Sequence, residues 1–82
     1  MADPIARHPF SGTGNKTVTF SNVASFLVFF NDGTTDITIN AGQFQTIVKG
    51  GDAFDERLDP FSELLITGSG SYHGYVRVRG VG

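Results

Sequence analysis

Apolar and polar residues alternate along most of the chain, with a period of two. In residues 16–20, Val18 and Phe20 alternate with threonines, which predicts a strand with one buried face. Residues 25–30 are apolar on both faces. Such a strand is expected to lie in the centre of the fold or beneath another chain.

Further runs of this kind predict the remaining strands. They are residues 36–40, 44–49, 54–58, 63–67 and 71–79. The run 54–58 also fits a single helical turn, and Pro60 has no N–H to donate, so a strand here is expected to end or to lie at a sheet edge. Most connections contain glycine. Asp32-Gly33, which stands between two β-rich runs, predicts a hairpin because glycine tolerates a positive φ.

Residues 1–15 show no periodicity and contain Pro4 and Pro9. They predict an extended N-terminal arm that becomes ordered only where it docks, with Ile5 and Phe10 as its apolar contacts. The competing interpretation is a frayed terminus.

The fold class follows from strand number and spacing. Six or seven short strands are separated by turns at intervals typical of small sandwiches and barrels. No helical period is long enough for a βαβ crossover, so the pairing is expected to be antiparallel. We therefore predict an all-β domain at residues 16–82, a small antiparallel β-sandwich or barrel of jelly-roll or immunoglobulin-like size.

Size and composition narrow the ways in which this domain is stabilised. A chain of 82 residues forms one domain with a small core. The absence of cysteine excludes disulfides and thiolate metal sites, and His8 and His73 lie too far apart in sequence for an ordinary zinc site. We expect no cofactor and no metal, and we expect a homo-oligomer to supply part of the stability.

Charge and hydropathy exclude several classes of partner. A net charge of −2 with 17% charged residues does not fit wrapping of nucleic acid, which needs a basic face. The longest apolar run, residues 26–30, is much shorter than the ~20 residues of a membrane helix. The N-terminal residues do not resemble a signal peptide, and synthesis in the cytoplasm is expected.

Two groups of residues invite a catalytic or ligand-binding interpretation. Gly12 and Gly14 are spaced as in a nucleotide loop, but a strand follows where that loop needs a helix. Acidic residues gather between residues 52 and 63, without the spacing of a calcium loop. A solvated acidic loop is the simpler interpretation, and we expect no catalytic residues and no enzyme activity.

The last strand carries the most informative surface. By the period-two rule, His73, Tyr75, Arg77 and Arg79 form one stripe. Arginine and tyrosine are frequent anchors at protein interfaces, so the stripe is a candidate partner-binding site that also suits anions or sugars. In the competing interpretation the arginines pair with acids such as Asp36 on neighbouring strands.

One set of features resembles a known group of proteins. The set is Asn31-Asp32-Gly33-Thr34-Thr35-Asp36-Ile37-Thr38-Ile39, Phe54, Leu58-Asp59-Pro60-Phe61, Leu65-Ile66-Thr67-Gly68, Tyr72 and Tyr75-Val76-Arg77. In strand spacing and in this order of motifs, residues 16–79 resemble small β modules of tailed-bacteriophage and prophage virion proteins. The resemblance implies a non-catalytic structural protein of the virion, as a capsid decoration, head–tail, tail or fibre component that forms a symmetric oligomer and contacts other virion proteins. It assigns no functional residues.

Two other functions remain open. A carbohydrate-binding module would use exposed aromatic side chains, and the only tyrosines are Tyr72 and Tyr75. A host-directed binding or inhibitor protein would use the same kind of surface as a virion component.

Overall fold

The computed structural model describes residues 4–79, except for the side chains of Pro4, Ile5, Asn22 and Arg79. This part of the chain contains six strands and no helix: β1 (Pro4–Thr13), β2 (Lys16–Asn31), β3 (Ile37–Ala41), β4 (Phe44–Val48), β5 (Ala53–Thr67) and β6 (Ser71–Arg79). They are hydrogen-bonded in the order β1-β6-β2-β5-β3-β4, and every pair is antiparallel. The all-β antiparallel prediction is confirmed.

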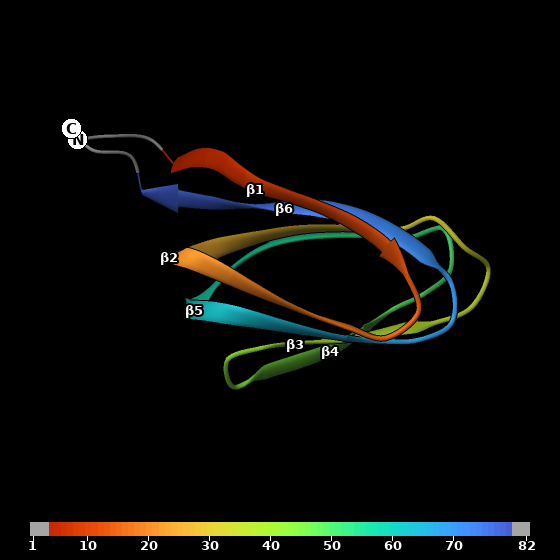
Figure 1. Cartoon of the computed structure of the whole chain (residues 1–82). Coiled ribbons are helices and arrows are strands. Elements are labelled where there is room, and N and C mark those ends of the chain that lie inside the picture. The colour runs from red at the N-terminus through yellow and green to blue at the C-terminus, as the bar shows by residue number, and fades with distance from the viewer. Residues whose placement is uncertain (1–3, 80–82) are drawn as a thin grey trace.

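The two longest strands, β2 and β5, run through both layers of a sandwich. They pair with each other along both halves, but residues 26–31 of β2 also pair with β6, whereas residues 64–67 of β5 pair with β3. The first layer therefore holds β1, β6, the end of β2 and the start of β5. The second layer holds the other halves together with β3 and β4, as Figure 1 shows. Within residues 4–79, β1 and β4 end the strand order and do not pair with each other, so the sandwich is not closed into a barrel.

The bend in these strands explains how Pro60 is accommodated. The β2–β5 register shifts between Thr19 and Ala24 and again between Ala24 and Phe26, opposite the segment around Pro60. An irregular ladder needs no N–H from this position, so β5 continues through the proline. The expectation that a strand ends at Pro60 is wrong, but this part of β5 does lie at an edge, because β3 pairs only with residues 64–67 of it. The runs 16–20 and 25–30 are likewise one bent strand.

The core lies between the two layers. Its members are Phe20, Ala24, Leu27, Phe29, Ile37, Ile39, Ala41, Val48, Phe61, Leu64, Ile66, Tyr72, Val76 and Val78. Aromatic rings link its elements: Phe29 stacks on Tyr72 with centroids 5.5 Å apart, and Phe20 meets Phe61 edge-on at 5.9 Å. Each large apolar side chain buried here contributes about 1.5–3 kcal/mol relative to exposure.

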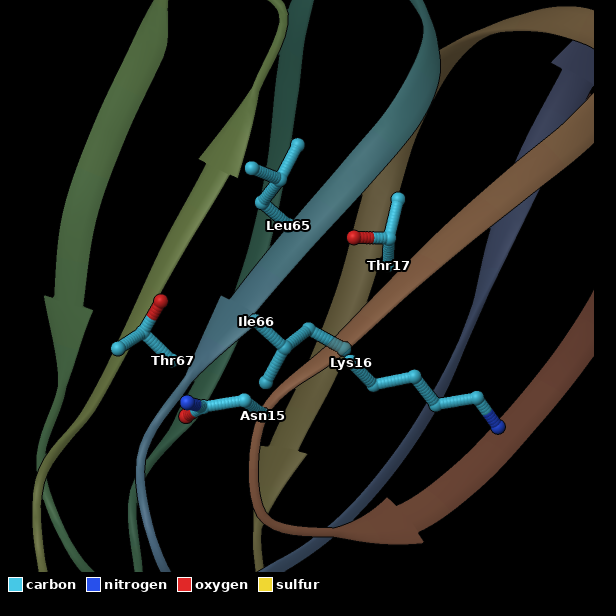
Figure 2. Close-up of a pocket in the computed structure, with 6 residues that line it drawn as sticks. All are labelled: Asn15, Lys16, Thr17, Leu65, Ile66 and Thr67. Atoms are coloured by element: carbon cyan, nitrogen blue, oxygen red, sulfur yellow. The ribbon is translucent and has the colours of Figure 1, made fainter.

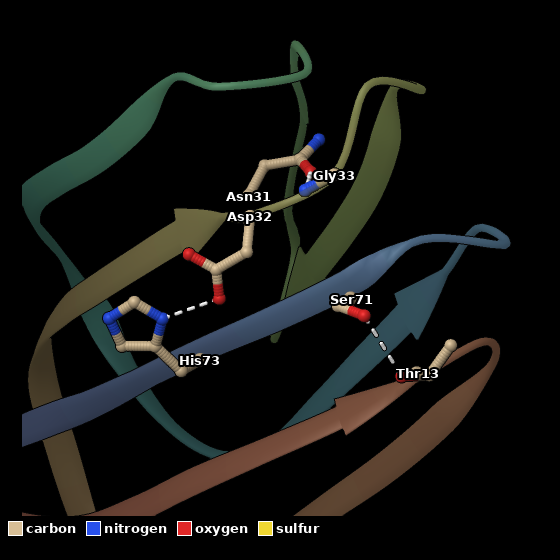
Figure 3. Close-up of polar contacts among 6 residues, drawn as sticks. All are labelled: Thr13, Asn31, Asp32, Gly33, Ser71 and His73. Carbon is tan, nitrogen blue, oxygen red and sulfur yellow. Dashed lines mark hydrogen bonds and ion pairs between the residues drawn. The ribbon is translucent and has the colours of Figure 1, made fainter.

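The segment after Asn31 is a crossover between the layers. The end of β2 pairs with β5 and β6, whereas β3 pairs with β4 and β5, so the hairpin predicted at Asp32-Gly33 is wrong. Asn31 is only 3% exposed, and hydrogen bonds from its side chain hold this segment in place of a tight turn. Its Nδ2 donates to the carbonyls of Thr35 and Val48, at 2.7 and 2.9 Å. Its Oδ1 accepts from the Gly33 N–H at 3.0 Å, as Figure 3 shows. The Asp32-Gly33 pair is typical of a hairpin, but the buried side-chain amide of Asn31 holds the chain in a different conformation here.

Residues 4–13, expected as an arm outside the domain, form strand β1 against β6. Its partner lies far away in sequence, and the register shifts between Arg7 and Phe10 around His8, whose φ is 55°. This bulge hides the alternation from sequence reading. Residues 1–3 of the expected arm lie outside the described residues. Phe10 is half-buried and packs against the core.

The Tyr72 hydroxyl is buried and finds no hydrogen-bond partner among the described residues. It lies against Gly12, where an added Cβ would be 2.8 Å from the phenol oxygen. An unpaired buried hydroxyl costs stability, so Tyr72→Phe is expected to raise the free energy of unfolding by about 1 kcal/mol in urea denaturation. A loss of stability would contradict this account of the site.

The same burial gives Tyr72 a pH signature. Desolvation raises the pKa of Tyr72 above its usual 10.0, so the unfolded chain loses this proton first. The contribution of Tyr72 to the free energy of unfolding is therefore fully present below pH 10 and falls as the pH rises above it. The Tyr72→Phe protein should lack this part of the alkaline loss, whereas Tyr75→Phe should retain it.

Candidate binding face

The side chains of β6 divide between the two sides of the first layer. Tyr72, Val76 and Val78 are buried in the core. His73 is exposed and Tyr75 and Arg77 are half-buried on the outer side, as alternation predicts. That this outer stripe binds a partner stays a prediction.

Neighbouring β2 adds an apolar row beside the stripe. Phe30 lies opposite His73, Val28 opposite Tyr75 and Phe26 opposite Arg77. Val28 is only 2% exposed and lies at the base of the surface, whereas Phe26 and Phe30 remain half-buried. The apolar outer side of residues 25–30 is thus central in the sheet and partly covered by the chain's own side chains.

Strand β5 supplies charges on the far side of this row. Arg57 lies opposite Phe26 and Asp55 opposite Val28. The Arg57 guanidinium carbon lies 5.9 Å from the Phe26 ring centroid, and that of Arg77 lies 5.9 Å from the Tyr75 centroid. We call the surface formed by Phe26, Phe30, Arg57, His73, Tyr75 and Arg77 the aromatic–arginine face.

The alternation pattern did not identify Arg57, Phe26 and Phe30 as members of this face. They join it only through the β2–β5 and β2–β6 registers. The apolar outer side of residues 25–30 was the signal that something lies there, but it does not identify the neighbouring strands.

The His73 ring is held from two directions. It stacks on Phe30 with centroids 4.6 Å apart and planes inclined by 13°. Its Nδ1 lies 2.6 Å from Asp32 Oδ2, as Figure 3 shows. The His73 and Asp32 side chains are 52% and 43% exposed, so the pair orients the ring and adds little to stability. Asp32 thus connects the crossover to the aromatic–arginine face through its contact with His73.

Arg77 also has an acidic neighbour, although a distant one. Its Nη1 lies 3.8 Å from Asp55 Oδ1, and the two side chains are 36% and 57% exposed. The acid is Asp55 on β5, not Asp36. At this distance and exposure the pair contributes at most about 1 kcal/mol. Arg77 therefore retains donors that a partner can use.

A hollow of about 510 Å³ adjoins the face at Arg57. Phe44, Leu58 and Asp59 line the rest of it. Phe44 also meets Phe54, with ring centroids 5.6 Å apart. The hollow joins an apolar wall to one basic and one acidic side chain, and it extends the face toward β4.

A second hollow, of about 330 Å³, lies between the start of β2 and the end of β5 (Figure 2). The side chains there are engaged by the chain itself. Asn15 Oδ1 accepts from the Gly68 N–H at 2.9 Å, and Lys16 Nζ donates to the Ser11 carbonyl at 3.4 Å. Figure 2 shows the Lys16 side chain directed away from Leu65 and Thr67. We therefore place no ligand in this hollow.

The acidic cluster predicted as a solvated loop is mostly part of a strand. Asp55, Glu56, Asp59 and Glu63 lie along β5 and are exposed. The sequence could not reveal this, because β5 alternates poorly where it bends. Within residues 4–79, no three histidine or acidic side chains form a group suited to a metal ion. The same residues include no helix long and apolar enough to cross a membrane.

Three predicted contact residues remain. Phe10 lies apart from the aromatic–arginine face, and the structure does not describe the side chains of Ile5 and Arg79. Phe10 meets Phe20, Phe29 and Tyr72, with ring centroids 6.2–6.4 Å away, and so faces the core. The backbones of Ile5 and Arg79 lie in the β1–β6 ladder, but their side chains are outside the described part.

Comparisons with known proteins leave the face as the main guide to function. No protein-family model, no curated protein and no solved structure matches this chain.

Proposed function

We propose that this protein is a non-catalytic structural or assembly component that binds another protein through the aromatic–arginine face. In line with the resemblance stated above, we propose the virion of a tailed phage or prophage as its place of action, as a capsid decoration, head–tail or tail component made in the host cytoplasm. The observation that carries the proposal is the face itself, where aromatic rings and two arginines lie side by side on one layer.

The composition of the face suits a protein partner. Aromatic side chains and arginine are enriched at interfaces and carry most hot-spot energy. The contacts among Phe30, His73 and Asp32 already fix these side chains, so binding loses little conformational entropy. Arg77 is available for a carboxylate or carbonyl on the partner.

The structure weakens the carbohydrate-binding alternative. Tyr72 is 2% exposed and packs in the core, so only Tyr75 of the two tyrosines is available as a sugar platform. His73 covers the ring of Phe30 on the same surface. A host-directed binding protein would use the same face, and the experiment below separates it from a virion component.

Substitutions in the aromatic–arginine face should release the protein from the virion particle. We expect the wild-type protein to co-sediment with particles purified from the phage or induced prophage that carries the gene, in a fixed ratio to the capsid or tail proteins. Tyr75→Ala and Arg77→Ala should each weaken rebinding to stripped particles by about 30-fold, the effect of losing a hot spot of about 2 kcal/mol.

Matched variants outside the face serve as controls. Leu65→Ala removes a 41% exposed apolar side chain from the other layer, and Lys49→Ala removes an exposed charge. Both should rebind as the wild type does. Absence of the protein from purified particles would overturn the virion proposal. Binding on a glycan array that Tyr75→Ala abolishes would favour the carbohydrate function, and saturable binding of a host protein that both face variants abolish would favour the host-directed one.

A further inference from the structure

We propose that strand β4 pairs in antiparallel fashion with β4 of a second copy of this chain, which joins two sandwiches into a closed two-fold dimer. The dimer is formed by the second layer and is independent of whatever the aromatic–arginine face binds on the first.

The backbone of β4 presents an open hydrogen-bonding edge. Among the described residues 4–79, β4 ends the strand order and pairs only with β3 (Figure 1). The two strands are joined by a two-residue loop whose first residue, Gly42, has a φ of 63°, as in a type II′ turn. Beginning with Phe44, every second residue then bonds to β3, so the N–H and C=O groups of Gln45 and Ile47 point away from the sheet.

Nothing in β4 protects this edge. Its sequence, Phe44-Gln45-Thr46-Ile47-Val48, contains no proline and no charge, and its pairing with β3 has no bulge. Ile47 is 58% exposed and Phe44 37%. Natural sheets usually block an exposed edge of this kind unless a partner covers it.

At the other end of the strand order, the edge formed by β1 is protected. β1 carries Pro4 and Pro9, which have no N–H, and it bulges at His8, where φ is 55°. Prolines and bulges prevent regular pairing along β1. Head-to-tail pairing of β4 with β1, which would grow into an open filament, is therefore disfavoured. Pairing of β4 with its own copy uses the same edge twice and closes on itself.

The chemistry of β4 is compatible with pairing to its own copy. The strand carries no charge, so two copies meet without repulsion, although the chain as a whole has a net charge of −2. An antiparallel two-fold pair centred on Ile47 places this residue beside its counterpart, and a pair centred on Thr46 places it opposite Gln45 of the second copy. The contact shields an apolar side chain that is otherwise in water.

The oligomeric state tests the proposal. Sedimentation equilibrium of the full chain should give the mass of a dimer at micromolar concentrations. Ile47→Lys places two like charges across the axis and is expected to raise the dimer dissociation constant by at least about tenfold. Val23→Lys is the matched control, because Val23 is 61% exposed on β2, and it should leave the dimer unchanged.

A second variant keeps the test decisive should Ile47→Lys not fold. The chain contains no cysteine, so Ile47→Cys introduces a single thiol. A short thiol-specific cross-linker should convert this variant into covalent dimers and leave Val23→Cys monomeric on a denaturing gel. A monomeric wild type at 100-fold higher concentration, equal cross-linking of both variants, or open-ended filaments would overturn the proposal. Tyr75→Ala should keep the dimer, which separates failure here from failure of the proposed function.

Discussion

Replacing Gly74 with alanine is expected to destabilise the protein by about 3 kcal/mol or more, a large part of the stability of a small domain. Gly74 lies in β6 between β1 and β2, opposite Phe10 on one side and Phe29 on the other. A Cβ at this position would collide with the Val28 carbonyl oxygen and would lie 3.2 Å from the Phe29 Cα. Both are backbone atoms of a central strand, which cannot move without breaking its ladder.

Urea denaturation followed by circular dichroism measures this effect. Gly33→Ala is the control, because an added Cβ there meets its nearest neighbour at 3.4 Å, which is ordinary contact. We expect the control to stay within about 1 kcal/mol of the wild type. A Gly74→Ala protein that is as stable as this control would contradict the close approach of β2 and β6 at this position.

Asn31→Asp is the second substitution expected to have a large effect. The carboxylate keeps the size of the amide but cannot donate to the carbonyls of Thr35 and Val48. It would place a buried negative charge against two carbonyl oxygens at a site that is 3% exposed. We expect a loss of about 3 kcal/mol at neutral pH.

The pH dependence of Asn31→Asp identifies the cause. Burial beside carbonyls raises the pKa of the new carboxyl in the folded state above its unfolded value. Stability should therefore be greater at low pH, where the carboxyl is protonated, and should fall as the pH rises through the folded pKa. Measured relative to the wild type, a loss that does not change with pH would contradict this explanation.

Asn15→Asp is a matched control for this pair of measurements. Asn15 is exposed and uses only its Oδ1, which accepts from the Gly68 N–H. Aspartate retains that acceptor, so the change should be within about 0.5 kcal/mol.

Asn31 and Asp32 connect the fold to the candidate binding face. Asn31 points inward and holds the crossover and the end of β4, whereas Asp32 points outward and contacts His73. Disruption of the crossover should therefore also disturb the stack of His73 on Phe30. A substitution at Asn31 that preserves the fold only in part is expected to weaken binding through the face as well.

The sequence by itself determined the all-β class and the sidedness of β6. Alternation depends only on the period of a strand, so the outward placement of His73, Tyr75 and Arg77 followed without knowledge of their neighbours. The turn between the predicted strands 36–40 and 44–49, which contains Gly42, depends equally on local sequence.

Only the tertiary structure decided which strands lie side by side. The β2–β6 and β1–β6 ladders join residues more than forty positions apart, and no local pattern identifies such partners. For that reason residues 4–13 were predicted as an arm and Asp32-Gly33 as a hairpin, while Arg57 was missed. Strand formation is set by each residue's own side chain, but pairing is set by the burial of the whole core, which the chain achieves only when distant segments meet.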